Sequence, residues 1–285
     1  MIRTMYKEKK TVYSLEVFPP KADADIQTIF TALDSMKGAN PDFISVTYGA
    51  GGSNSKKTVE IVSYIQNKCQ IEAVAHLTCA ALTPEKLTVF LDELKDKNVK
   101  NILALRGDKP IDMTEQEFEN RYFKHASDLV RAIDKHPKGS IAGACYPEIH
   151  TESANRAEDI KYLREKIEAG VDFLMTQLFY DNDVFYEFME EAKKGGITVP
   201  VSAGIMPITV ASQIKRTVEL SGSKIPTAMS HMLAKYRDNA PDLKKAGIEY
   251  AINQIEDLKK HGVEGIHLYS MNKADVAKEI FAAVK

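Results

Sequence analysis

Short apolar segments alternate with helical patterns along the whole chain, and this alternation constrains the fold more than any other feature. Most of the apolar segments are continuous, as in parallel strands that are covered on both faces. They lie at residues 12–18, 43–48, 72–79, 101–106, 141–146, 173–180, 199–205 and 265–270. The helical patterns lie at residues 24–36, 55–67, 84–95, 116–135, 157–169, 182–194, 210–220, 243–260 and 273–284.

Eight strand–helix units within 285 residues predict an α/β fold, a single (β/α)8 TIM barrel that forms one domain over residues 1–285. The rival fold, a doubly wound open sheet, has a glycine-rich phosphate loop after its first strand. Here the first strand ends in Phe18-Pro19-Pro20, which cannot form such a turn. Residues 226–236 predict an additional short helix before the last strand, either an insertion that covers a site or a longer helical layer.

Charge and cysteine content exclude several function classes. The chain has 38 Lys and Arg residues against 40 Asp and Glu residues, so it lacks the basic field of a nucleic-acid-binding protein. No apolar run approaches the roughly 18 residues of a membrane span, and the amino-terminal segment carries charge where a signal peptide is apolar. Three widely spaced cysteines fit neither a disulfide framework nor a zinc site. We therefore expect a cytoplasmic protein with no metal and no nucleic-acid or membrane partner.

In a TIM barrel the active site lies at the carboxyl ends of the strands, so polar residues there are the candidates. Glu16 lies among apolar neighbours, and burial without a partner would keep it protonated and make it a general acid. Pairing with a neighbouring Lys or Arg explains the same residue equally well. At the end of the fourth strand, Arg106 and Asp108 flank Gly107 and offer a cation for an anionic ligand with a carboxylate beside it.

The other strand ends suit a planar ligand. His76 lies in the third strand, where a lone histidine is more often a core residue than a functional one. Tyr146 and His150 follow the fifth strand and Gln177 the sixth, so rings and an amide are available to a flat heterocycle. The glycine-rich turn at residues 49–54 fits neither the dinucleotide nor the Walker spacing, which leaves a flexible barrel loop as the simpler interpretation.

A series of motifs, taken together, resembles the catalytic domain of methylenetetrahydrofolate reductase of the bacterial type. The motifs follow one another in the order and spacing of that family and cover nearly the whole chain. They are Glu16-Val17-Phe18-Pro19-Pro20-Lys21, Ser45-Val46-Thr47-Tyr48-Gly49-Ala50, Ala75-His76-Leu77-Thr78-Cys79, Leu105-Arg106-Gly107-Asp108, Tyr146-Pro147-Glu148-Ile149-His150, Thr176-Gln177-Leu178-Phe179-Tyr180-Asp181, Gly204-Ile205-Met206-Pro207 and His267-Leu268-Tyr269-Ser270-Met271-Asn272. The family is a (β/α)8 barrel that binds FAD without a dinucleotide fingerprint, in keeping with the failed glycine templates.

The resemblance implies FAD as cofactor, NADH or NADPH and methylenetetrahydrofolate as substrates, and a homo-oligomer that acts in one-carbon metabolism. The implied FAD site is lined by Thr47, Tyr48, His76, Arg106, Gly107, Asp108, Ala126, Tyr146, His150, Asp159 and Lys166. Gln177, Gln213 and Lys273 would contact folate, and Gln177 would also touch the nicotinamide. Three positions depart from the family pattern. Lys273 stands where Arg is common, Thr217 where an aromatic residue is expected, and Glu165, beside Lys166, where a second cation is usual.

The implied reaction is the ping-pong reduction of 5,10-methylenetetrahydrofolate to 5-methyltetrahydrofolate. Glu16 would protonate N10 to open the imidazolidine ring, and ionised Asp108 would stabilise the 5-iminium cation that forms. Two alternatives stay open, namely a proline-dehydrogenase-like FAD barrel and a non-catalytic barrel subunit that binds folate. No ribose-recognition motif is visible, so the sequence does not choose between NADH and NADPH.

Overall fold

The computed structural model describes residues 1–21, 25–49, 55–133 and 139–285, apart from the side chains of residues 215, 216 and 219–221. Most of the glycine-rich turn, at residues 50–54, lies outside the described residues, as do parts of two of the predicted helices. In the described part, no helix is both long enough and apolar enough to cross a lipid bilayer.

Parallel strands close into a barrel in chain order, which confirms the predicted TIM barrel. They are β1 (Val12–Val17), β2 (Phe43–Val46), β3 (Glu72–Thr78), β4 (Asn101–Leu105), β5 (Ile141–Cys145), β6 (Phe173–Thr176), β7 (Val201–Ile205) and β8 (Gly265–Tyr269). The barrel closes where β1 pairs with β8, and Glu16 lies opposite Ser45 of β2 on one side and Tyr269 of β8 on the other. Most strands end one or more residues before their predicted ends, so several polar candidates lie in the loops just beyond the ladder.

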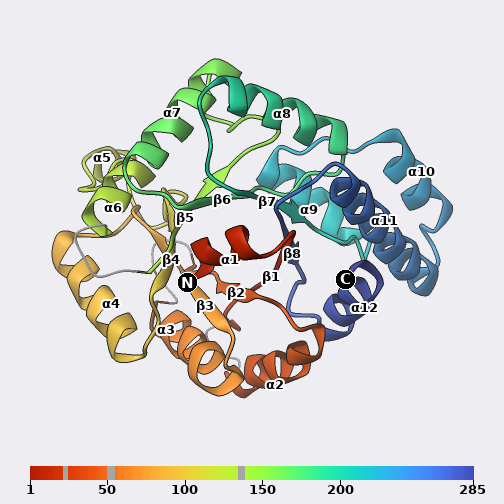
Figure 1. Cartoon of the computed structure of the whole chain (residues 1–285), viewed down its shortest axis with the longest axis horizontal. Helices are drawn as coiled ribbons and strands as arrows, with labels where there is room; N and C mark the ends of the chain where they lie inside the picture. The colour runs from red at the N-terminus through yellow and green to blue at the C-terminus, as the bar shows by residue number, and fades with distance from the viewer. Residues whose placement is uncertain (22–24, 50–54, 134–138) are drawn as a thin grey trace.

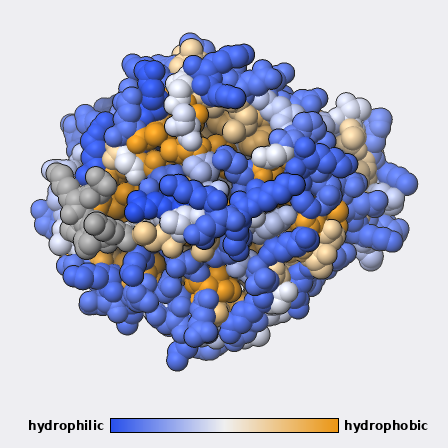
Figure 2. All heavy atoms as spheres, in the orientation of Figure 1, coloured by the Kyte–Doolittle hydropathy of each residue, from blue (hydrophilic) through white to orange (hydrophobic). Residues whose placement is uncertain are grey.

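The helices form a ring around the barrel (Figure 1). They are α2 (Gln27–Met36), α3 (Ser55–Tyr64), α4 (Pro84–Asp96), α7 (Arg156–Glu168), α8 (Asn182–Lys194), α9 (Ser212–Ser221), α11 (Ala240–Lys260) and α12 (Ala274–Val284), with short turns η1 (Lys37–Ala39) and η3 (Ile65–Cys69). Local chemistry sets their starts: at α4, Thr83 accepts a hydrogen bond from the Lys86 amide, and Pro84 occupies the first turn. The additional helix predicted before the last strand is α10 (Thr227–Lys235). Figure 2 shows a mostly hydrophilic outer surface, with apolar side chains visible mainly in the gaps between elements.

The single helix predicted over residues 116–135 is wrong, because two helices occupy this stretch. Helix α5 (Glu115–Glu119) begins with a capping box between Thr114 and Glu117. Helix α6 (Ala126–Ile133) begins where the Asp128 carboxylate accepts hydrogen bonds from the amides of residues 124 and 125. The apolar pattern runs through both helices, whereas these caps divide them.

An unpredicted helix, α1 (Ile2–Glu8), closes the amino-terminal end of the barrel. Its Ile2 is fully buried and packs with Val12, Phe43 and Phe173, which form part of the apolar floor of the barrel. In Figure 1, α1 lies across the middle of the ring. Because α1 blocks the amino-terminal end of the barrel, a substrate reaches the barrel interior from the carboxyl ends of the strands.

The barrel interior changes from apolar to polar toward the carboxyl ends of the strands. Side chains alternate along a strand, so Ser14 and Glu16 point to the same side as Val12 of the floor. Above the floor, the barrel strands carry a set of buried polar residues, namely Ser14, Ser45, His76 and His267. Glu16 lies at the top of this polar layer, which places it at the end of the barrel where TIM-barrel active sites lie.

Candidate active site at the carboxyl end of the barrel

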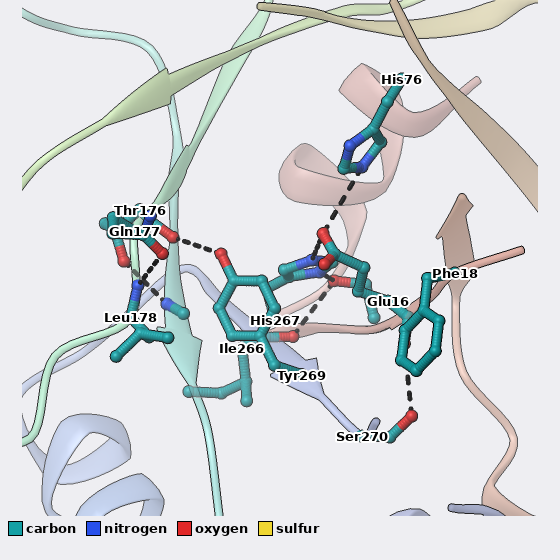
Figure 3. Close-up of polar contacts among 12 residues, drawn as sticks. Glu16, Phe18, His76, Thr176, Gln177, Leu178, Ile266, His267, Tyr269 and Ser270 are labelled. Carbon is teal, nitrogen blue, oxygen red and sulfur yellow. Dashed lines mark hydrogen bonds and ion pairs between the residues drawn. The ribbon is translucent and has the colours of Figure 1, made fainter. Parts of the chain in front are cut away.

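Glu16 lies between two buried histidines (Figure 3). Its Oε2 atom is 3.5 Å from Nε2 of His76 on β3 and 3.6 Å from Nε2 of His267 on β8. The Glu16 side chain is 19% exposed, so a ligand can still reach it. Among the described residues, no Lys or Arg pairs with Glu16, and the interpretation of this residue as half of a structural ion pair is not supported.

The two histidines are not ordinary core residues. Burial lowers the pKa of His76 to about 4, so this ring is neutral at neutral pH. The Nε2 atoms of both His76 and His267 are buried, and neither has a hydrogen-bond partner within the described chain. Buried polar atoms of this kind are uncommon, and here both are directed at the same carboxyl oxygen.

Gln177 follows β6 at the same end of the barrel, and the strand end before it is tightly fixed (Figure 3). The Tyr269 hydroxyl donates to the Thr176 carbonyl at 2.8 Å, and Thr176 Oγ1 accepts from the Gly204 amide at 2.8 Å. A Cβ atom on Gly204 would lie 2.4 Å from the Thr176 carbonyl oxygen, so only glycine fits. The Gln177 side-chain oxygen accepts from the Leu178 amide at 2.9 Å, which orients the side-chain amide.

A cavity of about 280 Å³ lies beside this site, between the ends of β4 and β5 and helices α6 and α7. It brings together a large part of the predicted cofactor set, namely Arg106, Ala126, Tyr146, His150 and Lys166. The Tyr146 and His150 rings pack edge to face, with centroids 4.6 Å apart. His150 follows Ile149, which has a φ of 73°, a strained value for a β-branched residue and one typical of functional loops.

Two cations give this cavity its chemical character. Lys166 is partly buried, and desolvation of its amine lowers its pKa. Its Nζ donates to the Ala144 carbonyl at 2.5 Å, and no carboxylate in the described chain forms an ion pair with it. Arg106 pairs at 2.9 Å with Glu152, whose side chain is 62% exposed and can move into water. The cavity can therefore bind an anion such as a phosphate group.

Asp159 lies next to this cavity and orders its wall. Its Oδ1 accepts from the Ser153 hydroxyl at 3.1 Å, and its Oδ2 is 3.9 Å from the Arg156 guanidinium. Arg156 in turn donates to the Tyr146 carbonyl at 2.9 Å. Asp159 thus holds the loop that carries the Tyr146 and His150 rings.

The predicted folate residues Gln213 and Lys273 meet at Thr209, a buried residue that the sequence analysis missed. Thr209 Oγ1 accepts from Lys273 Nζ at 2.6 Å and donates to Gln213 Oε1 at 3.1 Å. Gln213 Oε1 also accepts from the amides of Thr209 and Val210, both at 2.9 Å. Thr217 is buried, and its hydroxyl is 3.9 Å from the Met206 sulfur. The signal available in the sequence was the Gly204-Ile205-Met206-Pro207 motif shortly before Thr209.

Three other predicted residues lie outside the Glu16 site, the Lys166 cavity and the Thr209 contacts. Tyr48 packs edge-on against Phe90 and lines a separate cavity of about 450 Å³ near α3 and α4. Thr47 is half-buried, and its carbonyl accepts from the Thr58 hydroxyl. Asp108 is exposed and makes no hydrogen bond or ion pair within the described chain, although its charge acts on Tyr146.

Gly107, just before Asp108, has a φ of 77°, and a Cβ atom there would lie 2.7 Å from the Thr78 Cβ. Only glycine can therefore make this turn at the end of β4. His267 and Tyr269 are the other residues that sequence reasoning missed. Their signal was the two-residue period of β8, which directs both side chains to the same side of the strand.

The described residues contain no group of three or more His, Cys, Asp or Glu side chains placed to hold a metal ion. The donors at this end of the barrel are instead hydroxyl, amide, imidazole and cationic groups, which suit an organic ligand with anionic and heterocyclic parts.

Comparisons with known proteins place the chain among its relatives. The sequence model of the methylenetetrahydrofolate reductase family matches residues 1–285. The chain is 37% identical over 280 residues to methylenetetrahydrofolate reductase 1 of Schizosaccharomyces pombe, covering 96% of this chain and 46% of the fungal protein. It is 31% identical over 267 residues to 5,10-methylenetetrahydrofolate reductase of Escherichia coli K12, covering 94% of this chain and 88% of the bacterial protein.

The chain thus spans about half the length of the fungal and plant relatives that it matches, 46% of the fungal protein and 48% of methylenetetrahydrofolate reductase (NADH) 1 of Arabidopsis thaliana. Among solved structures, a tryptophan synthase chain from M. tuberculosis superposes with a TM-score of 0.55 at 12% identity, covering 99% of this chain and 97% of that one. At this identity the likeness concerns the barrel fold alone.

Proposed function

The chain belongs to the methylenetetrahydrofolate reductase family, and we propose that it reduces 5,10-methylenetetrahydrofolate to 5-methyltetrahydrofolate with electrons from NADH or NADPH. The observation that carries the proposal is the position of Glu16. A carboxyl group with no Lys or Arg partner in the described chain lies at the open end of the barrel, between two imidazoles, and the proposed reaction needs a general acid.

The cavity around Lys166 and Arg106 supports FAD as the cofactor. Lys166 is a partly buried amine that forms no ion pair with a carboxylate in the described chain, and the FAD pyrophosphate would supply an anionic partner. Arg106, Tyr146 and His150 would complete the site, with Asp159 ordering its wall. When bound, FAD supplies a two-electron carrier that accepts hydride from the nicotinamide and passes it to the folate.

The chain's own residues would bind the folate and handle the proton. Glu16 would donate its proton to N10, which opens the imidazolidine ring, and Asp108 would stabilise the cation with its negative charge. Lys273 and Gln213, joined through Thr209, would hold the folate at the same end of the barrel. Lys273 would act as a single point charge on the folate carboxylate, since an ammonium lacks the paired donors of arginine.

Glu16→Gln tests the proposal, because it removes the acidic proton and keeps the size of the side chain. We expect the variant to bind FAD and to be bleached by NADH or NADPH like the wild type. Reoxidation by methylenetetrahydrofolate should fall by about 10²–10⁴-fold, the usual contribution of a general acid. Glu190→Gln, on an exposed part of α8, is the matched control and should leave both steps unchanged.

A Glu16→Gln variant that keeps folate reduction, or that loses both steps, would contradict the acid role. The same assay separates the alternatives. A proline-dehydrogenase-like barrel would be reduced by proline, and a non-catalytic subunit would bind folate without turnover in the wild type. Assembly into a homo-oligomer stays a prediction from the family, which sedimentation analysis would test.

A further inference from the structure

His267 is held rigidly beneath Glu16. Its side chain is fully buried on β8, and its ring is stacked against Phe43 and packed edge-on against Tyr269, with centroids 6.3 Å and 5.1 Å away. One ring nitrogen, Nδ1, is 2.8 Å from the Ser14 hydroxyl, and the other, Nε2, is directed at Glu16 Oε2 (Figure 3). The ring therefore has fixed contacts on both nitrogens and no room to turn.

The contacts of Ser14 favour one tautomer of the neutral His267 ring. A serine hydroxyl has one hydrogen to donate, and Ser14 Oγ lies 3.3 Å from the Ile266 carbonyl, which can only accept. With its hydrogen directed there, Ser14 accepts a hydrogen bond from Nδ1–H of His267. The neutral ring then has a lone pair on Nε2, and a protonated Glu16 is the group in position to donate to it.

We propose that His267 is a positioning residue that keeps the catalytic proton on Glu16 until folate binds, with Ser14 fixing the required tautomer. The inference rests on the acid role of Glu16 proposed above. In the resting state, Glu16 Oε2–H donates to Nε2. When folate arrives, the hydroxyl turns to N10 and the O–H bond breaks as the N10–H bond forms. Glu16 is left as a carboxylate and regains a proton from water between turnovers.

No charged side chain of the described residues faces Glu16. The titratable groups that face it are His76 from β3 and His267 and Tyr269 from β8. His76 is neutral because burial lowers its pKa, and Tyr269 is neutral because burial raises its pKa. In the described chain no cation pairs with Glu16, so no nearby charge holds it ionised. The separation of 3.6 Å between Glu16 Oε2 and His267 Nε2 has to shorten by a few tenths of an ångström, which a small rotation of the Glu16 side chain supplies, for the resting hydrogen bond to form.

The pH dependence of flavin reoxidation by methylenetetrahydrofolate tests the proposal in the FAD-loaded enzyme. Reoxidation needs the proton on Glu16, so its rate falls on the alkaline side of the profile. His267→Phe keeps a flat ring against Phe43 but removes the acceptor, so this alkaline fall should move to lower pH by about one unit, the value of one hydrogen bond. At a pH above the fall, the rate should drop about tenfold. Flavin bleaching by NADH should not change.

Two further variants test the same hydrogen bonds independently. Ser14→Ala removes the group that fixes Nδ1–H, so the same fall should move in the same direction by a smaller amount. His267→Gln restores an acceptor and should recover part of the profile. Ser202→Ala is the matched control, since Ser202 is a buried barrel serine whose hydroxyl contacts Tyr6 at 2.7 Å. It should leave the position of the fall unchanged.

The possible results separate this proposal from the function on which it rests. If Glu16→Gln abolishes reoxidation while His267→Phe and Ser14→Ala keep the wild-type profile, the role of His267 is refuted and the function stands. If Glu16→Gln reoxidises normally, the acid role itself fails, whatever His267 does. If His267→Phe does not bind FAD, Ser14→Ala decides, and an unmoved alkaline fall in that variant overturns the proposal.

Discussion

Removal of the partly buried Lys166 amine should weaken FAD binding without destabilising the fold. Lys166 lies on α7 with its Nζ in the cavity that also contains Arg106 and Tyr146. Its Nζ donates a hydrogen bond to the Ala144 carbonyl, and no carboxylate in the described chain forms an ion pair with it. Burial lowers its pKa, so the fold bears the cost of a desolvated amine. Lys166→Met keeps the length and apolar stem of the side chain and removes the charge.

The magnitude follows from the contact that is lost. One charge-assisted hydrogen bond to a phosphate oxygen contributes about 1.5–3 kcal/mol. The Kd for FAD should therefore rise by about 10- to 100-fold. The stability of the flavin-free protein should change by less than about 1 kcal/mol, because the lost hydrogen bond is offset by relief of the buried charge.

Flavin titration followed by fluorescence quenching measures the Kd, and thermal unfolding of the flavin-free protein measures stability. Lys193→Met, which removes an exposed lysine on α8, is the control and should change neither. Because the lowered pKa makes Lys166 lose its charge at a lower pH than an exposed lysine, wild-type affinity should fall as the pH rises. The Lys166→Met variant should lack this dependence. Unchanged FAD affinity, or weaker affinity explained by unfolding, would refute the assignment of this cavity to the pyrophosphate.

Two other predictions concern the folate residues and the packing behind them. Thr209→Val removes the hydroxyl that joins Gln213 to Lys273, so KM for methylenetetrahydrofolate should rise about tenfold. Bleaching of the flavin by NADH should not change. Equal KM values for the variant and the wild type in steady-state assays would contradict this link. Gly247→Ala should destabilise the protein by about 1–3 kcal/mol in thermal or denaturant unfolding, because the added Cβ would lie 1.7 Å from the Ile208 carbonyl oxygen. A variant as stable as the wild type would show that α11 does not pack closely against Ile208.

The fold was readable from the sequence because the strands of a barrel are continuous apolar runs separated by helices. The residues at which the strands end were harder to predict. The run at residues 173–180 continues beyond β6, which ends at Thr176, because Leu178 and Tyr180 are also apolar. These two side chains pack with Met229 of α10 and take no part in the strand ladder. Helix α1 escaped prediction because it is short and mostly polar, with Ile2 as its buried residue.

The sequence identified single residues of the candidate site but not the contacts between them. Glu16 and Arg106 come from separate motifs and Lys166 from none, and the resemblance to a family named all three without showing their neighbours. Contacts across the barrel are invisible in a sequence: Ser14 and His267 are 253 residues apart, yet their side chains are 2.8 Å apart. Closure of the barrel between β1 and β8 creates this pair, and no local pattern contains it.

The most direct test of the proposed reaction is an anaerobic two-step experiment on the FAD-loaded protein. NADH or NADPH is added first and the flavin absorbance is followed, and methylenetetrahydrofolate is then added to the reduced protein. We expect the flavin to bleach in the first step and to regain its colour in the second, with one 5-methyltetrahydrofolate formed for each flavin reoxidised. A protein that takes up no flavin, or whose bleached flavin is not reoxidised by methylenetetrahydrofolate, would contradict it.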